Sequence, residues 1–194
     1  MTYFEYQAIY FGIIVGLALA NILGSVHKLV EAGSRVRWGW MAPLTAGYAA
    51  TFTLCEFWFL WIRRNDPGHH TILSWLPLAA AFALLYLMCA AALPDEVGEP
   101  GVDLNRYYTQ NRYRLWGFAA VLHALNLCSW LVGFWEAGFD ATVVRGGLWA
   151  VFGNATECLL SLSLIFVRAT WWNALVLAGL WAFILSVFGP MPLS

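Results

Sequence analysis

The chain has 194 residues, of which 61% are hydrophobic and only 11% are charged, whereas a soluble domain of this size carries about 25% charged residues. These proportions exclude a soluble globular protein. The formal net charge of −1 offers no basic excess to hold a phosphate backbone, which argues against a nucleic-acid partner. Aromatic residues make up 17% of the chain and include 12 tryptophans, whose amphipathic rings suit a membrane interface.

Six apolar stretches are each long enough to cross the hydrocarbon core of a bilayer, which takes about 20 helical residues. Short connections that carry charges, prolines or glycines separate them. We therefore predict an all-α fold, a polytopic integral membrane helical bundle of six transmembrane helices that forms a single domain over residues 1–194. The predicted spans cover about residues 8–26, 39–62, 71–93, 115–134, 147–167 and 169–191.

Basic residues are divided unevenly between the two sets of connections. The first, third and fifth connections hold Lys28, Arg35, Arg37, Arg106, Arg112, Arg114 and Arg168. The other set holds only Arg63, Arg64 and Arg145. Because lysine and arginine are retained on the cytoplasmic side, this asymmetry predicts that both termini lie outside the cytoplasm, with a bacterial inner membrane as the expected location.

The two halves of the chain share a weak pattern. A shift of 105 positions brings a glycine, a leucine and an asparagine at residues 12, 17 and 21 onto the same residue types at 117, 122 and 126. A connection of about twelve residues is also expected after the first span of each half. Three spans per half would make a 3+3 inverted repeat, as in many transporters. The alternative is that two apolar helices share these few residue types by chance.

A stripe of small residues runs along the first span. Gly12, Gly16, Ala20 and Gly24 recur every four residues and therefore lie on one helical face. Such a stripe lets a neighbouring backbone approach closely. We favour a contact within the chain over a contact between copies, because five other spans need partners.

Polar side chains in the middle of the fifth span are the strongest functional signal. An ionisable group at a helix centre in the membrane costs about 2.5–3.5 kcal/mol and therefore rarely faces lipid. Glu157 falls at the middle of the predicted span, and Asn154, Cys158 and Ser161 share its face. This stripe must face protein or water.

Further polar groups lie at membrane depth in other spans. His123 and Asn126 share a face of the fourth span, Glu56 lies in the second, and Asn21 lies near the inner end of the first. From the span centres we expect Glu56 to lie roughly 9 Å nearer the outer surface than Glu157. We expect Asn126 and Asn154 at the level of Glu157, and His123 about one turn nearer the cytoplasm. Together with Ser161, these residues form a candidate ion or solute pathway, or hydrogen bonds that hold helices together.

A basic and aromatic segment precedes the fourth span. It contains Arg106, Tyr107, Tyr108, Arg112 and Arg114. Guanidinium groups bind anionic phosphates and tyrosine rings favour headgroup depth, so this segment is predicted to contact lipid at the cytoplasmic interface.

Two functions of different classes agree with these features. The first is a small transporter or channel that passes protons, a cation or a small polar solute by way of Glu157 and Glu56. The second is a non-catalytic membrane subunit that binds a partner complex or assembles with its own copies. An enzyme ranks below both, because the sequence yields no nucleophile–base pair or metal-ligand set. A haem between His27 and His123 is disfavoured, because their predicted depths differ by roughly 12 Å. No cofactor is identified.

Overall fold

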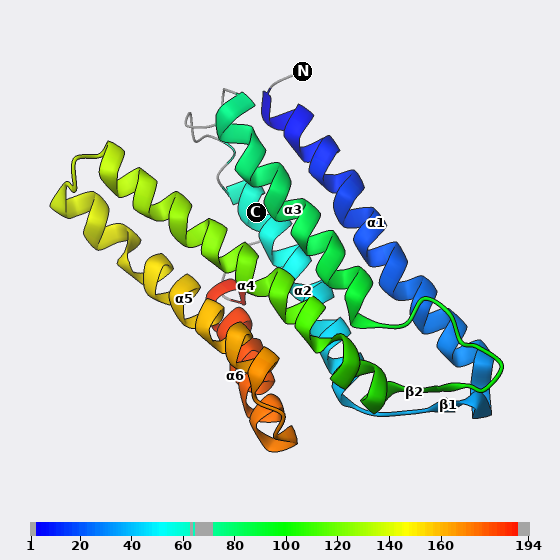
Figure 1. Cartoon of the computed structure of the whole chain (residues 1–194). Helices are drawn as coiled ribbons and strands as arrows, with labels where there is room; N and C mark the ends of the chain where they lie inside the picture. The colour runs from blue at the N-terminus through cyan, green and yellow to red at the C-terminus, as the bar shows by residue number, and fades with distance from the viewer. Residues whose placement is uncertain (1–2, 63, 65–71, 190–194) are drawn as a thin grey trace.

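The computed structural model describes residues 3–62, 64 and 72–189. Within these ranges the chain forms six α-helices that run in alternating directions (Figure 1). They are α1 (Tyr3–Ala32), α2 (Met41–Ile62), α3 (Ile72–Ala92), α4 (Leu104–Glu136), α5 (Ala141–Phe166) and α6 (Thr170–Phe188). The 3-10 helix η1 (Gly33–Arg35) and the two-residue strands β1 (Val36–Arg37) and β2 (Val102–Asp103) lie in the connections.

Five of these helices, all except α2, are long and apolar enough to cross a membrane. The 22 residues of α2 are long enough for a span, and they include Glu56 and three threonines. Helix α2 packs against α1, α3, α4 and α6, so protein surrounds much of it. The predicted all-α membrane bundle is confirmed.

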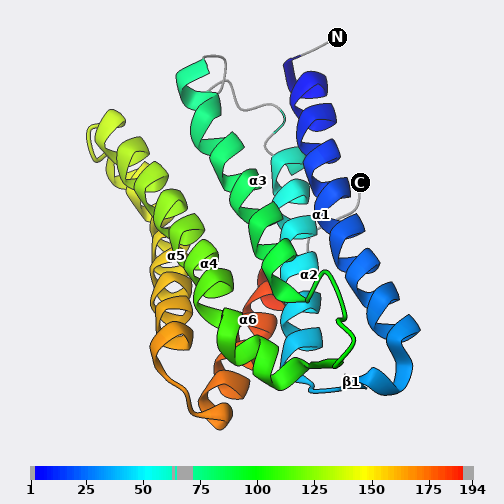
Figure 2. The same cartoon turned by 45° about the vertical axis from the view of Figure 1, so that its right-hand side comes forward.

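The helices form two groups that meet at α2 and α4. Helices α1, α2 and α3 pack together, and α4 lies against α3 with α5 along its other side (Figures 1 and 2). Helix α6 contacts α2 and α5. The two strands and the α5–α6 turn lie at one end of the bundle, and the α4–α5 turn lies at the other (Figure 2). In the second half of the chain, α5 therefore contacts both α4 and α6, and α2 of the first half contacts α4 and α6.

The α4–α5 connection is much shorter than the sequence suggested. Helix α4 continues to Glu136 and α5 begins at Ala141, so the connection has four residues rather than about twelve. Gly138 and Phe139 adopt positive φ angles that reverse the chain. Asp140 then caps α5, and the hydrogen bond from the Thr142 hydroxyl, followed by those from backbone amides, holds the pKa of the Asp140 carboxyl below its usual value.

The two halves of the chain also pack differently. In the first half α1 packs along α3, whereas in the second half α4 packs along α5. A close approach explains the second arrangement, because a Cβ atom on Gly147 would lie 2.6 Å from the Phe134 ring. The equal connections expected in the two halves are absent, and the internal repeat stays a prediction.

The small-residue stripe of α1 does not contact another helix of the chain along most of its length. Within the described residues, a Cβ atom at Gly16 or Gly24 would meet no atom of another part of the chain within 4 Å, although one at Gly12 would lie 3.7 Å from Phe57. The buried face of α1 instead comprises Phe11, Val15, Ala18, Ile22 and Leu29. Our preference for an intrachain contact was therefore wrong, because larger side chains supply more buried apolar surface than glycines do.

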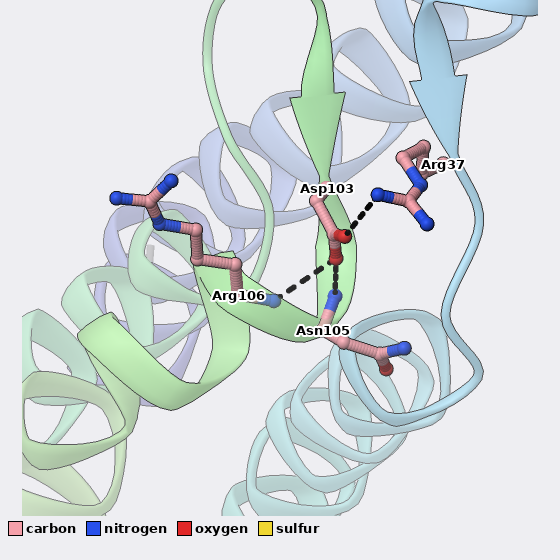
Figure 3. A network of polar contacts seen from close by, with 4 residues as sticks. All are labelled: Arg37, Asp103, Asn105 and Arg106. Atoms are coloured by element: carbon pink, nitrogen blue, oxygen red, sulfur yellow. Dashed lines mark hydrogen bonds and ion pairs between the residues drawn. The ribbon is translucent and has the colours of Figure 1, made fainter.

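A clasp between two connections joins the start of α2 to the start of α4. Strands β1 and β2 pair in parallel, with Val36 opposite Val102 and Arg37 opposite Asp103. Asp103 accepts hydrogen bonds from the backbone amides of Asn105 and Arg106, at 2.9 and 3.1 Å, and lies 3.8 Å from the Arg37 guanidinium (Figure 3). We call β1, β2 and these contacts the loop clasp.

Gly101→Ala is expected to weaken the loop clasp. Gly101 has a φ of +83°, and a Cβ atom there would collide with the backbone carbonyl oxygen of Arg35. The free energy of unfolding should fall by about 1–3 kcal/mol, which is typical of a strained left-handed residue. Denaturant unfolding in detergent micelles measures the change. Gly98→Ala is the control, because its Cβ would meet only Pro100 at 3.5 Å; equal stability of the two variants would contradict this role of Gly101.

Candidate functional site

A histidine and a glutamate from neighbouring helices meet in the interior of the bundle. His123 on α4 places Nδ1 3.2 Å from Oε2 of Glu157 on α5, with side-chain exposures of 1% and 8%. The contact lacks hydrogen-bond alignment. By strict hydrogen-bond geometry, neither ring nitrogen of His123 nor Oε1 of Glu157 has a partner within the described part of the chain, although the Asn154 side chain lies within reach of the ring. Sequence analysis identified both residues but not their contact.

The His123–Glu157 contact shows that the membrane depths predicted for these two residues were wrong. The predicted fifth span was centred on Glu157, but α5 begins at Ala141 and has its midpoint near Asn154. Glu157 therefore lies about one turn nearer the end that carries Arg168. This shift brings it level with His123, which was expected one turn deeper.

Helix α2 covers the His123–Glu157 pair with aromatic rings. The Phe52 ring lies 5.3 Å from the imidazole, and Tyr48, one turn earlier, stacks on Phe52 at 5.8 Å. Tyr48 is 1% exposed and lies close enough to Glu157 to sense its charge. Its hydroxyl has no hydrogen-bond partner among the described residues. Sequence analysis missed Tyr48; its spacing of eight residues from Glu56 was the available signal.

A second hydroxyl lies on the same face of α5 as Glu157. Ser161 follows Glu157 by one turn, is 1% exposed, and its Oγ also lacks a hydrogen-bond partner within the described residues. We call Tyr48, His123, Glu157 and Ser161 the core polar cluster. Its members come from α2, α4 and α5, and the Trp181 ring of α6 lies 6.2 Å from the Tyr48 ring.

Glu56 extends this polar region toward the end of α2. It follows Phe52 by one turn and is partly exposed. Among the described contacts Glu56 does not touch Glu157, yet it lies close enough to influence the charge of both Glu157 and Tyr48. The structure thus brings Glu56 near the cluster without adding it to the buried pair.

The three predicted asparagines differ in their positions. Asn154 lies beside the His123 ring and donates its amide to the Ala150 carbonyl at 2.8 Å. Asn126 lies one turn beyond His123 on α4 and is partly buried. Asn21 is on α1, which packs mainly on α2 and α3, so the structure does not bring it to the cluster.

Three residues of the predicted lipid-contacting segment instead bind protein. Tyr108 and Arg112 are each only 8% exposed, and the Arg112 guanidinium donates to the Val167 carbonyl at 3.0 Å. Tyr107 is partly buried and donates its hydroxyl to the Leu93 carbonyl at 2.9 Å. The physical reason is that the last carbonyls of α3 and α5 need donors where the helices end. Arg106 and Arg114 are exposed, and their lipid contact stays a prediction.

A buried hydrogen-bond network joins α4 to the α5–α6 turn. The Tyr108 hydroxyl donates to Oδ1 of Asn173 at 2.9 Å and accepts from the Trp116 indole at 3.1 Å. Asn173 donates to the carbonyls of Val167 and Ala169, at 3.1 and 2.8 Å. We call this the α6 anchor. Sequence analysis missed it, because one asparagine among apolar residues has no distinctive spacing.

Metal and haem ligation receive no support from the described residues. No group of three or more His, Cys, Asp or Glu side chains in the described ranges could hold a metal ion. His27 lies on the exposed end of α1, with a side-chain exposure of 76%, and contacts Glu31 at 3.9 Å. It is not brought together with the buried His123.

The chain matches no family model, no curated protein and no solved structure. Its function is therefore inferred from the contacts described above. The protein is a membrane protein with a helical bundle. Among its described residues is a buried polar cluster in which several atoms lack a hydrogen-bond partner.

Proposed function

We propose that the protein is a small membrane transporter or channel in which an ion or a small polar solute passes the His123–Glu157 pair. The observation that carries this proposal is the 3.2 Å contact between two ionisable side chains in the bundle interior. Ionisable residues inside a membrane are expensive and characteristically mark ion pathways or proton relays. Glu56, within electrostatic reach of Glu157, supplies a second carboxylate toward one surface.

A purely structural role, in which hydrogen bonds of His123 and Glu157 only hold helices together, is a poorer account of this pair. Side chains that only hold helices together gain stability by forming complete hydrogen bonds. Here five polar atoms of the core polar cluster have no partner within the described residues. Each buried unsatisfied group costs about 1–3 kcal/mol, so this arrangement is poorly suited to stability alone.

Glu157→Gln is expected to reduce flux at least about tenfold in proteoliposomes while the protein still folds, because glutamine keeps the shape but cannot ionise. Flux is measured separately for protons, for monovalent cations and for small polar solutes. The matched control is Glu136→Gln, which removes an exposed carboxylate at the end of α4. Full flux in folded Glu157→Gln would contradict the proposal.

We further propose that both termini lie outside the cytoplasm of a bacterial cell. The alternating helices put seven basic residues at the end that carries the loop clasp, and Arg64 and Arg145 at the other. A cysteine at Phe139 should react with an impermeant maleimide in intact cells, whereas one at Gly98 should not, both in a cysteine-free background. Labelling of Gly98 but not Phe139 would reverse the orientation. The other position chosen from sequence, Gly68, lies outside the described residues.

The second candidate function is a membrane subunit that assembles with its own copies or with a larger complex. The observation that favours it is the open small-residue face of α1, where Gly16 and Gly24 meet no other part of the described chain within 4 Å. In this case Glu157→Gln would leave flux unchanged. Assembly in the membrane would instead depend on the size of the residues at positions 16 and 24.

A further inference from the structure

We infer that the core polar cluster holds bound water and that the transported species is the proton rather than an alkali cation. This inference rests on the proposed function and names its substrate. It is carried by the unpartnered atoms of the cluster, by their burial, and by the chemistry of the groups that surround them.

The first observation is the concentration of unpartnered atoms. They are the Tyr48 hydroxyl, both nitrogens of His123, Oε1 of Glu157 and Oγ of Ser161, within the described part of the chain. The four residues are 1%, 1%, 6% and 1% exposed, so bulk solvent does not satisfy them. Buried polar groups without protein partners typically bind ordered water, which makes two to four hydrogen bonds.

The second observation is that this cluster combines donors and acceptors. The hydroxyls of Tyr48 and Ser161 can donate and accept, the carboxylate accepts, and the imidazole does both. The other unpartnered buried atoms in the described residues are the indole nitrogens of three tryptophans and the amide nitrogen of Gln7, which only donate. Among the described residues, the core polar cluster is therefore the group of unpartnered buried atoms that offers water both donors and acceptors.

The third observation argues against an alkali cation. Hard cations prefer a shell of about six or more oxygen ligands. Besides Asn154 next to the imidazole, the side-chain oxygens of the cluster come from Tyr48, Glu157 and Ser161, and the Phe52 and Trp181 rings lie against His123 and Tyr48. His123 contributes nitrogen, which suits a proton. A proton needs no such shell, because it binds covalently to a carboxyl, an imidazole or a water molecule.

The transfer step is a simple exchange between the paired groups. The O–H bond of protonated Glu157 breaks and its proton passes to a bound water molecule, which releases one of its own protons to form an N–H bond at Nδ1 of His123; this leaves a carboxylate, a neutral water and an imidazolium. Bound water then accepts the proton from the imidazolium and restores neutral histidine, while a proton from the side of Glu56 returns Glu157 to its acid form. The charges balance and no oxidant or reductant is required.

The experiment measures proton flux into proteoliposomes that contain choline as the only cation besides the proton. Flux should persist without sodium or potassium. Tyr48→Phe and Ser161→Ala should each lower it about tenfold, because each removes one hydrogen-bond partner of the water. The controls are Tyr107→Phe and Ser129→Ala, whose hydroxyls donate to backbone carbonyls away from the cluster, and both should retain flux.

Infrared spectroscopy gives a second measurement that does not depend on the variants. The folded parent protein in D₂O should show a weakly hydrogen-bonded water band that resists exchange with bulk solvent, and its absence would overturn the inference. Flux that requires sodium or potassium would also overturn it, while the loss of flux in Glu157→Gln would still support the transport function. Full flux in Glu157→Gln, or no flux of any species in the parent, would reject the transport function itself.

Discussion

His123→Leu is expected to lower the free energy of unfolding by about 1–3 kcal/mol, the cost of leaving a buried polar group without its partner. Glu157 is only 6% exposed, so bulk solvent does not replace the lost imidazole. Glu157→Leu should cost a similar amount, because it leaves His123 buried without its carboxylate. Unfolding by denaturant in detergent micelles, followed by tryptophan fluorescence, measures these changes.

The double variant His123→Leu/Glu157→Leu separates stability from transport. Replacing both members of a buried pair by apolar residues is often neutral or stabilising, so the double variant should be close to the parent in stability. It should nevertheless have no flux. Strictly additive destabilisation would show that the two side chains do not interact, and retained flux would show that transport does not use them.

Asn173→Leu should lower the free energy of unfolding by about 3 kcal/mol, because it removes the centre of the α6 anchor. The change leaves the Tyr108 hydroxyl and two backbone carbonyls with one partner fewer at a site where Asn173 is 3% exposed. Leucine matches asparagine in size, so little of the loss comes from packing. Denaturant unfolding of the purified protein measures it.

The control for Asn173→Leu is Asn111→Leu. The Asn111 amide donates only to the Tyr107 carbonyl of its own helix, at 3.1 Å, and should contribute little to stability. A loss at Asn111 as large as that at Asn173 would indicate that the α6 anchor has no special role. A loss confined to Asn173 would show that the α5–α6 turn is held by this network.

The number of helices could be predicted from the sequence because the length of an apolar run reports directly on a membrane span. The ends of the helices could not be predicted in this way. The apolar run of the fourth span begins at Leu115, whereas α4 begins at Leu104, because its first turns expose polar residues such as Thr109 and Gln110 to solvent. A search for apolar runs stops at such residues even where the helix continues.

The candidate site could be predicted in composition but not in geometry. Glu157 and His123 stood out because ionisable side chains are rare at membrane depth. Their contact was missed because depth was counted from run centres, and the early start of α5 moved Glu157 by about one turn. Tyr48 and Asn173 carried too little signal, because their roles depend on which helices pack together, and that is a non-local property.

The loop clasp also has an evolutionary consequence. Asp103 pairs with Arg37 and is followed directly by the first residue of α4, so the clasp sets the rotational position at which α4 begins. One inserted residue between Asp103 and His123 would turn every later side chain of α4 by about 100° and move the imidazole away from Glu157. Homologous genes should therefore keep the number of codons between these two positions constant.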